Sequence, residues 1–434
     1  MSKMRVCNIT FDWYPFDPLV RRLAEAAADG GHSVDVICLR QSHDKDHEVY
    51  NGVHIYRVPM NRGFGQPLFV TIMNWCWFSL LAALYVTRLH LKDSYHVIHV
   101  HNIPDFLVFS ALIPRLLGAK VILHVQDVCP ELMAAKTQGR KRKIITRLAT
   151  WQERISTDFA HHVITVGWPF EQLLLRRGVP QEKITIILNS ADPKLFPASR
   201  RCPSPFDTPK QGQPFIVMYH GTLAERNGLD VAIRALALAL QTVPHLRLDI
   251  QGRGEHLPFL KQLAEELGVS EHVVFTAPCP TEQVVDFVVH GDIGIIPYQS
   301  DGFMDLVLPT KAYEFAWMHR PMIASDTPAI RSMFRPESII FCNPHEPESF
   351  ANAVIDLFRH PEKRARMVMS ASEDYELFRW ENMTVRYLLL LTSLRYTRKQ
   401  KRETLSYSEP VTILAAHKEH DHYRLNSVQG GEDA

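Results

Sequence analysis

The sequence predicts an α/β protein made of two doubly wound, Rossmann-like domains. Its 434 residues exceed what a single hydrophobic core usually supports. Short β-branched runs alternate with amphipathic helical stretches in both halves, which is typical of parallel sheets covered by helices. A polar, proline-bearing stretch over 197–214 lacks apolar periodicity and separates the two series. We therefore expect a first domain over 1–196, a linker over 197–214 and a second domain over 215–374.

The expected elements follow one another in the order of βα units. In the first domain, an amphipathic helix over 19–29 follows the first of the strand-like runs, which lie at 4–10, 33–39, 53–58, 95–101, 120–125 and 161–166. In the second domain, the strand-like runs lie at 215–221, 246–252, 273–278, 292–298 and 321–326. The helical stretches between them span 229–240, 258–268, 282–291 and 310–319. No GxGxxG follows the first strand, so a nicotinamide oxidoreductase of this fold class is set aside.

The end of the chain predicts two further segments. Residues 375–395 predict a C-terminal helix that packs back on the first domain. The tail over 396–434 is polar, charged and aperiodic, so we expect it to be poorly ordered.

Composition favours a cytoplasmic protein that does not bind nucleic acid. The formal net charge of +1 gives no global attraction to a polyanion. The seven cysteines are odd in number and never spaced as CxxC, which disfavours a disulfide framework and a zinc site. The first residues lead directly into a strand-like run and lack the features of a signal peptide.

One apolar segment, Leu68 to Thr87, contains no charged residue over 20 positions. Its length equals that of a membrane-spanning helix, but polar residues interrupt it and αβ structure continues on both sides. We expect a buried or partly buried helix of the first domain. The alternatives are a helix at a membrane surface, with basic residues up to position 92 facing headgroups, and a true span.

The residues around 308–325 (LPTKAYEFAWMHRPMIAS) predict an anion site at a helix N-terminus. Pro309 and Thr310 begin the helix, whose free backbone amides suit a diphosphate. Lys311 adds a positive charge for phosphate, and Glu314 can accept hydrogen bonds from the two hydroxyls of a ribose. An ordinary capped helix with an exposed Lys311–Glu314 pair is the alternative.

Two glycine loops at strand ends predict further contacts with the same ligand. The first, YHGTLAERNG, contains Gly221, Arg226 and Asn227, and glycine lets the backbone approach a ligand closely while arginine can pair with phosphate. The second, QGRGE, contains Gly252 and Gly254. A plain β-turn is the alternative interpretation of either loop taken alone.

Polar residues also follow two strand-like runs of the first domain. His99 and His101 alternate onto one face, and Gln126 and Asp127 follow the run at 120–125. For the two histidines, a satisfied core position or a contact with the acceptor is favoured over a metal, and we predict no metal site.

These motifs together resemble the retaining glycosyltransferases of family 4, in their order and spacing, from about Arg5 to Leu394. The stretch around Glu314 matches the Pro-x-Lys-x-x-Glu variant of that family, with Leu306 where many members have a first glutamate. Thr222 and Asn227 stand where the family usually has Arg and Lys, so Arg226 with Lys311 would serve the diphosphate. Gln126 stands where the family usually has His, and a neutral amide can hold a sugar hydroxyl but cannot act as a base.

The resemblance implies a GT-B fold, in which two domains face a cleft, and transfer of a sugar from a nucleotide sugar. It implies catalytic roles for His101, Gln126 and Asp127, retention of configuration, and no cofactor other than the nucleotide-sugar co-substrate. The element over 16–25 is similar to one common in bacterial members. The resemblance and the apolar 68–87 segment together lead us to expect a lipid-linked or polysaccharide acceptor, and peripheral contact with the inner face of the cell membrane through 68–92. A sugar-nucleotide epimerase and a catalytically inactive assembly component are the alternatives.

Overall fold

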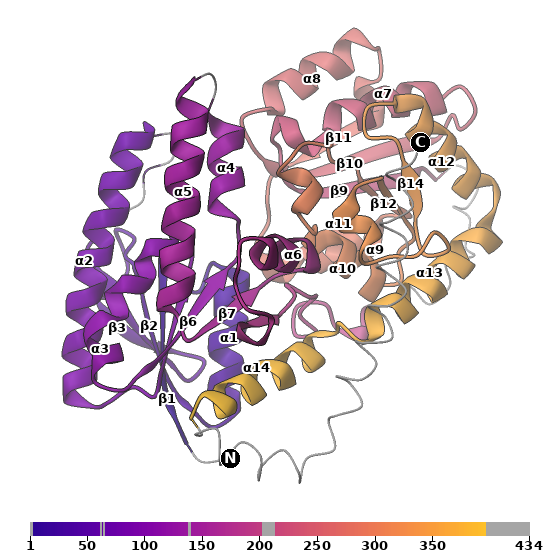
Figure 1. Cartoon of the computed structure of the whole chain (residues 1–434). Helices are drawn as coiled ribbons and strands as arrows, with labels where there is room; N and C mark the ends of the chain where they lie inside the picture. The colour runs from indigo at the N-terminus through magenta and orange to yellow at the C-terminus, as the bar shows by residue number, and fades with distance from the viewer. Residues whose placement is uncertain (1–2, 61–62, 64–65, 138–139, 202–212, 396–434) are drawn as a thin grey trace. The chain divides into compact units, whose positions relative to one another are not determined.

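The computed structural model describes residues 3–60, 63, 66–137, 140–201 and 213–395. The expected tail over 396–434 and most of the expected linker lie outside these residues. The described residues divide into two compact units, one from those within 3–188 and 381–395 and the other from those within 189–380 (Figure 1).

The first unit contains an eight-stranded sheet in the order β3-β4-β2-β1-β5-β6-β7-β8. Its strands are β1 (Arg5–Trp13), β2 (Ser33–Leu39), β3 (His47–Tyr50), β4 (Val53–Val58), β5 (Val97–His101), β6 (Lys120–Val125), β7 (His162–Thr165) and β8 (Ile184–Ile186). All neighbours pair in parallel except β3 with β4. The two edge strands, β3 and β8, lie outside the strand-like runs predicted from the sequence, because they have only four and three residues.

Helices cover this sheet on the connections between its strands. They are α1 (Pro18–Asp29), α2 (Leu68–Lys92), α3 (Leu112–Leu116), α4 (Cys129–Lys136), α5 (Arg140–Phe159) and α6 (Trp168–Arg176), with the 3-10 helix η1 (Asp105–Ala111) before α3. Asp17 caps α1 by accepting hydrogen bonds from the amides of Leu19 and Val20, which satisfies two amides of its first turn.

The last helix, α14 (Trp380–Arg395), contributes to the first unit although it ends the described chain. The hydroxyl of Tyr387 lies 3.0 Å from Nδ1 of His99 on β5. The Arg386 guanidinium donates to the carbonyl of Ile186 at 3.1 Å. These contacts join positions 288 and 200 residues apart in the sequence, so no local pattern could have specified them.

The second unit contains a six-stranded, fully parallel sheet in the order β11-β10-β9-β12-β13-β14. Its strands are β9 (Phe215–Thr222), β10 (Leu246–Arg253), β11 (Val273–Thr276), β12 (Ile293–Ile296), β13 (Met322–Ser325) and β14 (Ile340–Cys342). Its helices are α7 (Leu229–Ala239), α8 (Leu257–Glu266), α9 (Val284–His290), α10 (Thr310–Trp317), α11 (Pro328–Arg331), α12 (Pro347–Arg359) and α13 (Pro361–Glu376). The strands and the inner faces of α7, α8 and α12 form one continuous hydrophobic core.

Both sheets are doubly wound, as predicted. In each, the chain runs outward from a central strand in two directions, so a switch point lies between β1 and β5 and another between β9 and β12. Ligands of open α/β sheets bind at the carboxyl ends of the strands beside such a point. The two strand ends therefore locate the regions where a site is to be sought.

The apolar segment forms α2, a helix of 25 residues that packs on the first unit by one side only. Its buried residues, Phe78, Ala82, Val86 and His90, recur every four positions and face the sheet. By length and composition α2 is the one described helix that could cross a membrane, yet only 17% of its most apolar window is buried. The expected helix of the first domain is thus partly buried, and most of its apolar surface faces outward.

Candidate functional site

The carboxyl ends of β9 and β10 come into direct backbone contact, and glycine makes this contact possible. A Cβ atom at Gly252 would lie 1.9 Å from the carbonyl oxygen of Gly221, and one at Gly254 would lie 2.0 Å from that of Leu223. Any side chain at these positions would force the two strand ends apart. The sequence places glycine here because two backbones, and a ligand beside them, must approach closely.

An open cavity of about 240 Å³ lies at the same strand ends. Residues of the two glycine loops and of the segment before α9 line it, namely His220, Gly221, Thr222, Gln251, Gly252, Arg253, Pro278, Cys279 and Val284. The cavity combines exposed backbone, polar side chains and a small apolar wall. Such a mixture suits a flat polar ligand such as a nucleobase.

Lys311, in the first turn of α10, places a buried positive charge next to Gly221, which lines the cavity. Its ammonium donates to the hydroxyl of Tyr298 at 2.8 Å and lies 4.7 Å from the ring centres of both Tyr298 and Tyr219. Burial alone would lower the pKa of Lys311, but the two phenol groups and Glu314 outweigh it and raise the pKa above its usual value. Lys311 therefore stays charged at neutral pH. It also lies close to the first glycine loop, because a Cβ added at Gly221 would be 3.6 Å from its Nζ.

Glu314 lies one turn further along α10 and faces the end of β9. Its Oε2 is 3.0 Å from Nε2 of His220, and both side chains are largely buried. This contact connects the helix motif with the first glycine loop. The structure thus brings Gly221, Gly252, Lys311 and Glu314 together, and we call this group with its cavity the donor edge.

The remaining donor-side residues differ in what they offer. Pro309 precedes α10 without a side-chain cap, so the amides of Thr310 and Lys311 at its N-terminus suit an anion. Arg226 is exposed at the tip of its loop. Asn227 is buried, and its side-chain amide donates to the Tyr219 hydroxyl at 3.0 Å and to the carbonyl of Thr222. Asn227 thus holds the shape of the loop.

A second group of polar residues lies at the ends of β5 and β6 in the first unit. The Asn102 side-chain oxygen accepts hydrogen bonds from the amides of Gln126 at 2.8 Å and of Asp127 at 3.3 Å. Its nitrogen donates to the Asp127 carbonyl at 2.7 Å and to Asp105 at 2.6 Å. Asn102 therefore holds the segment that carries Gln126 and Asp127 through three of its backbone groups.

Of the residues predicted to be catalytic, Gln126 and Asp127 are partly exposed, whereas His101 is fully buried. The side-chain nitrogen of Gln126 lies 3.3 Å from Nδ1 of His101. His101 thus lies behind Gln126 and is not exposed itself.

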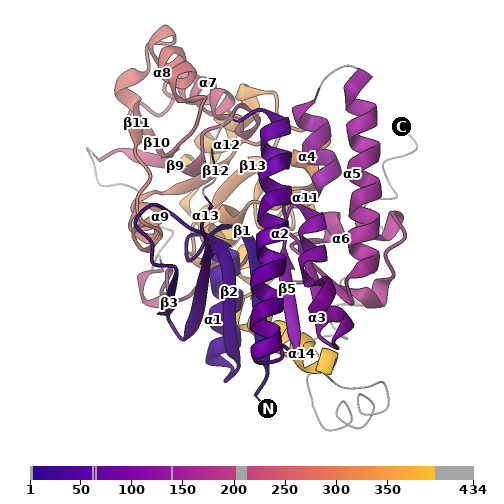
Figure 2. The ribbon, with the colours of Figure 1, turned by 90° about the vertical axis from the view of Figure 1, so that its left-hand side faces the viewer.

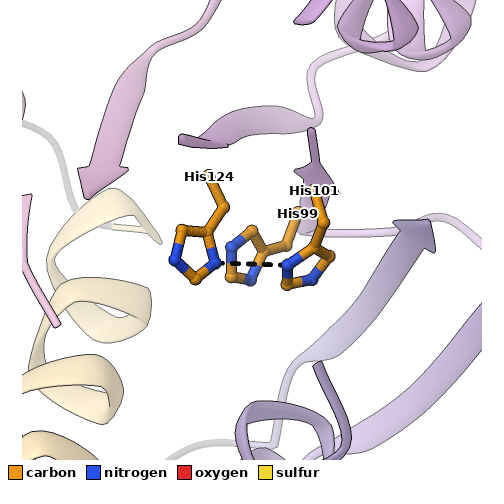
Figure 3. A group of neighbouring side chains, drawn as sticks. All are labelled: His99, His101 and His124. Atoms are coloured by element: carbon orange, nitrogen blue, oxygen red, sulfur yellow. Dashed lines mark hydrogen bonds between the residues drawn. The ribbon is translucent and has the colours of Figure 1, made fainter. Parts of the chain in front are cut away.

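His101 belongs to a cluster with His99 and His124, which we call the histidine cluster (Figure 3). Register pairs His101 on β5 with His124 on β6, so their side chains share one face of the sheet. Their Nδ1 atoms are 3.2 Å apart, and Nε2 of His101 lies 3.1 Å from the side-chain oxygen of Asn8. Burial lowers the pKa of all three rings, for His124 to about 3, so they are neutral at physiological pH.

Among the residues that the structure describes, this cluster is the one group whose atoms could share a metal ion, all lying within 4.8 Å of one another. Imidazole nitrogen is a ligand for zinc and copper. Both ring nitrogens of His101 already face protein groups, on His124 and Asn8, and Nδ1 of His99 faces the Tyr387 hydroxyl. We interpret the cluster as a neutral, hydrogen-bonded support for the strand ends.

Several site residues were not singled out from the sequence. His220 and Gln251 stand directly before glycines of the quoted motifs, so their place at a strand end was the available signal. Tyr298 follows β12, at the switch point, and Asn102 follows β5 in the same way. His124 lies on the strand-like run at 120–125, and register alone brings it to His101.

The two halves of the chain match two described families. The family "Glycosyl transferase 4-like domain" matches residues 18–190, and "Glycosyl transferases group 1" matches residues 203–374. An uncharacterized glycosyltransferase of Methanocaldococcus jannaschii is 26% identical over 399 residues, which cover 88% of this chain and 96% of that protein. A GDP-mannose-dependent alpha-(1-6)-phosphatidylinositol monomannoside mannosyltransferase of Mycolicibacterium smegmatis is 27% identical over 191 residues, which cover 42% of this chain and 49% of that protein.

Solved glycosyltransferase structures share the fold. Sucrose-phosphate synthase from Thermosynechococcus elongatus superposes with a TM-score of 0.69 at 19% identity and covers 90% of this chain and 99% of its own. The HepE protein of Anabaena in complex with UDP-glucose gives a TM-score of 0.65 at 16% identity, with 90% and 100% covered. At this identity the likeness concerns the fold, which is the two-domain α/β arrangement predicted from the sequence.

Proposed function

We propose that the donor edge binds the nucleotide-sugar donor. The premise is that the chain is a glycosyltransferase with a GT-B fold, whose first half matches a 4-like glycosyltransferase domain and whose second half matches the glycosyltransferases of group 1. The observation that carries this proposal is the convergence of Lys311 and Glu314 on the glycine-lined ends of β9 and β10. The nucleobase would enter the cavity beside Gln251 and Cys279. The two hydroxyls of the ribose would donate to the Glu314 carboxylate.

The diphosphate of the donor is the group whose charge grows during transfer. Buried Lys311, exposed Arg226 and the amides of α10 are positioned to stabilise that charge. Their positive field meets the need that a divalent ion meets elsewhere, so the proposed reaction uses no metal. This interpretation explains why Gly221 and Gly252 leave room for the diphosphate and why Lys311 lies next to Gly221.

We propose that transfer proceeds with retention of configuration. The bond between the sugar and the diphosphate breaks, a bond to the acceptor oxygen forms on the same face, and the acceptor proton passes to the departing diphosphate. Gln126 and Asp127 of the first unit would orient the acceptor by hydrogen bonds to its hydroxyls. His101 would support Gln126 from below.

For the acceptor we propose a lipid-linked sugar or a growing polysaccharide at the inner face of the cell membrane. A relative from Mycolicibacterium smegmatis is named for a phosphatidylinositol acceptor, and the outward apolar surface of α2 supports contact with lipid. A sugar-nucleotide epimerase and an inactive assembly component are not favoured, because the matched families and relatives are glycosyltransferases.

A thermal-shift panel with UDP, GDP, ADP and their sugars tests the donor site. A ligand that binds only the folded state raises the melting temperature, by an amount that corresponds to about 2.7 kcal/mol at a hundred times its Kd. We expect one nucleotide to stabilise the protein and the Glu314→Gln variant to lose roughly ten- to hundredfold in affinity for it. Glu348→Gln, on the exposed surface of α12, is the control. Unchanged affinity in Glu314→Gln would remove the donor site from the proposed place.

A further inference from the structure

Three helices of the first unit form one outward surface. Helix α2 contacts η1 and α3, and α5 contacts η1 as well. Figures 1 and 2 show α2, α3 and α5 on the same side of the N-terminal sheet. Helix α2 packs on β1, β2 and β4, α3 and α5 pack on η1, and α4 packs on α5, while part of each of α2, α3 and α5 stays exposed.

The outer faces of these helices are apolar. On α2 most of the exposed large apolar side chains follow one helical face, namely Phe69, Met73, Trp77, Leu80, Leu84 and Leu91. On α3 the exposed apolar residues are Leu112, Ile113 and Leu116. On α5 they are Ile144, Leu148 and Trp151, and Phe69, Leu116 and Trp151 are exposed by 73%, 73% and 62%. Monomeric proteins rarely expose a continuous apolar surface of this kind without a partner.

Positive charge borders this surface. Lys143, Arg147 and Arg154 are exposed on α5, each one position before or three positions after a member of its apolar stripe, so they form a basic stripe beside it. Arg88 and Lys92 are exposed near the end of α2. Helices α2 and α3 contain no acidic residue.

The acidic residues of α5 do not offset this charge along the stripe. Glu153 is buried and paired with Arg177, and Asp158 lies beyond the apolar stripe at the end of the helix. A second copy of the chain would bring the two basic stripes together, whereas an anionic surface would complement them.

We propose that this face docks onto an anionic lipid bilayer, with the apolar side chains of α2, α3 and α5 in the interface and the basic residues against phosphate headgroups. The proposal deepens the proposed function, which places the acceptor at the membrane, and it extends the contact from α2 to three helices. It does not depend on the donor edge, because all of its residues belong to the first unit.

Flotation of the purified full chain with phosphatidylcholine vesicles, with and without phosphatidylglycerol, tests the proposal. We expect binding to the anionic vesicles, weakened by salt, and little binding to the neutral ones. Arg147→Glu should reduce binding more than fivefold, since removing one basic contact costs about fivefold and the new charge repels the surface. Trp151→Glu should reduce binding by a similar or larger factor.

Matched controls lie on α13 of the second unit. Met369 is exposed by 62%, the same as Trp151, and Arg366 is also exposed, so Met369→Glu and Arg366→Glu should leave vesicle binding unchanged. Circular dichroism and melting temperature show that each variant is folded. Wild-type protein that does not float with anionic vesicles, or that instead forms a dimer through Trp151, overturns the proposal. Nucleotide-induced thermal shifts in the same samples report the donor site separately, so either proposal can fail alone.

Discussion

Polar residues lie at strand ends beside both switch points of this protein, but their arrangement and exposure differ between the two units. At the ends of β9 and β10 the backbone is bare, a cavity opens, and a charged lysine lies beside it. At the ends of β5 and β6 three neutral histidines fill the space, and His101 reaches the partly exposed Gln126 only through a contact of 3.3 Å. The first arrangement suits the binding of a charged ligand. The second holds a segment of backbone in place, so the strand ends of two similar sheets have different roles.

Replacing Lys311 by Met tests the buried positive charge of the donor edge most directly. The thioether side chain can fill the space between Tyr219 and Tyr298 but carries no charge. We expect kcat to fall roughly 10²- to 10³-fold, as when a group that stabilises transition-state charge is removed, with a small change in melting temperature. Lys261→Met, on the exposed face of α8, should leave kcat unchanged. Normal turnover in Lys311→Met would show that the buried charge is structural.

Replacing Gly252 by Ala tests the close backbone contact between the ends of β9 and β10. The new Cβ would lie 1.9 Å from the Gly221 oxygen, and because that atom belongs to backbone the two strand ends must separate. We expect a loss of about 1–3 kcal/mol of unfolding free energy, measured by urea denaturation, and weaker nucleotide binding. At Gly302 a Cβ would meet nothing within 4 Å, so Gly302→Ala is the matched control. Equal stability of the two variants would contradict the close approach of the loops.

Replacing Asn102 by Ala tests the polar residues at the ends of β5 and β6, which we call the supporting region. The change removes the acceptor of the Gln126 and Asp127 amides and the donor to Asp105, all partly or fully buried. Each unsatisfied group costs about 1–3 kcal/mol, so stability should fall by that order. Activity should fall while the nucleotide-induced thermal shift persists, since the donor edge belongs to the other unit. Loss of both together would argue for global unfolding instead.

The sequence predicted the donor edge better than the histidine cluster for a physical reason. The donor edge is made of residues at strand ends and at a helix start, namely Gly221, Gly252, Lys311 and Glu314. At such positions the local backbone conformation restricts which residue types fit. The contact of His220 with Glu314 depends on how α10 packs against β9, so it could not be read from either motif. The histidine cluster depends on β-strand register and on Tyr387, nearly 290 residues away in sequence.

The outward face of α2 shows the same limit. Its composition predicted a helix. The spacing of its apolar residues and its length did not decide whether that helix is buried in the domain, lies at a membrane surface or spans a membrane. Only packing showed that Phe78, Ala82, Val86 and His90 face the sheet while the other side of the helix remains exposed.

The smallest expected effect concerns Asp105, which the supporting region buries completely. Burial raises the pKa of Asp105 to about 6, against the hydrogen bonds from Asn102 and Gln152 that lower it. The folded state therefore binds this proton more tightly than the unfolded state, whose carboxyl has a pKa near 3.8. The resulting stabilisation is fully present below that value and is lost as pH rises through about 6. Between pH 5 and pH 7 wild type should lose about 1 kcal/mol that Asp105→Asn does not lose. Urea denaturation of both proteins across this range measures the difference, and parallel curves would mean that Asp105 is ionised throughout and compensated by its neighbours.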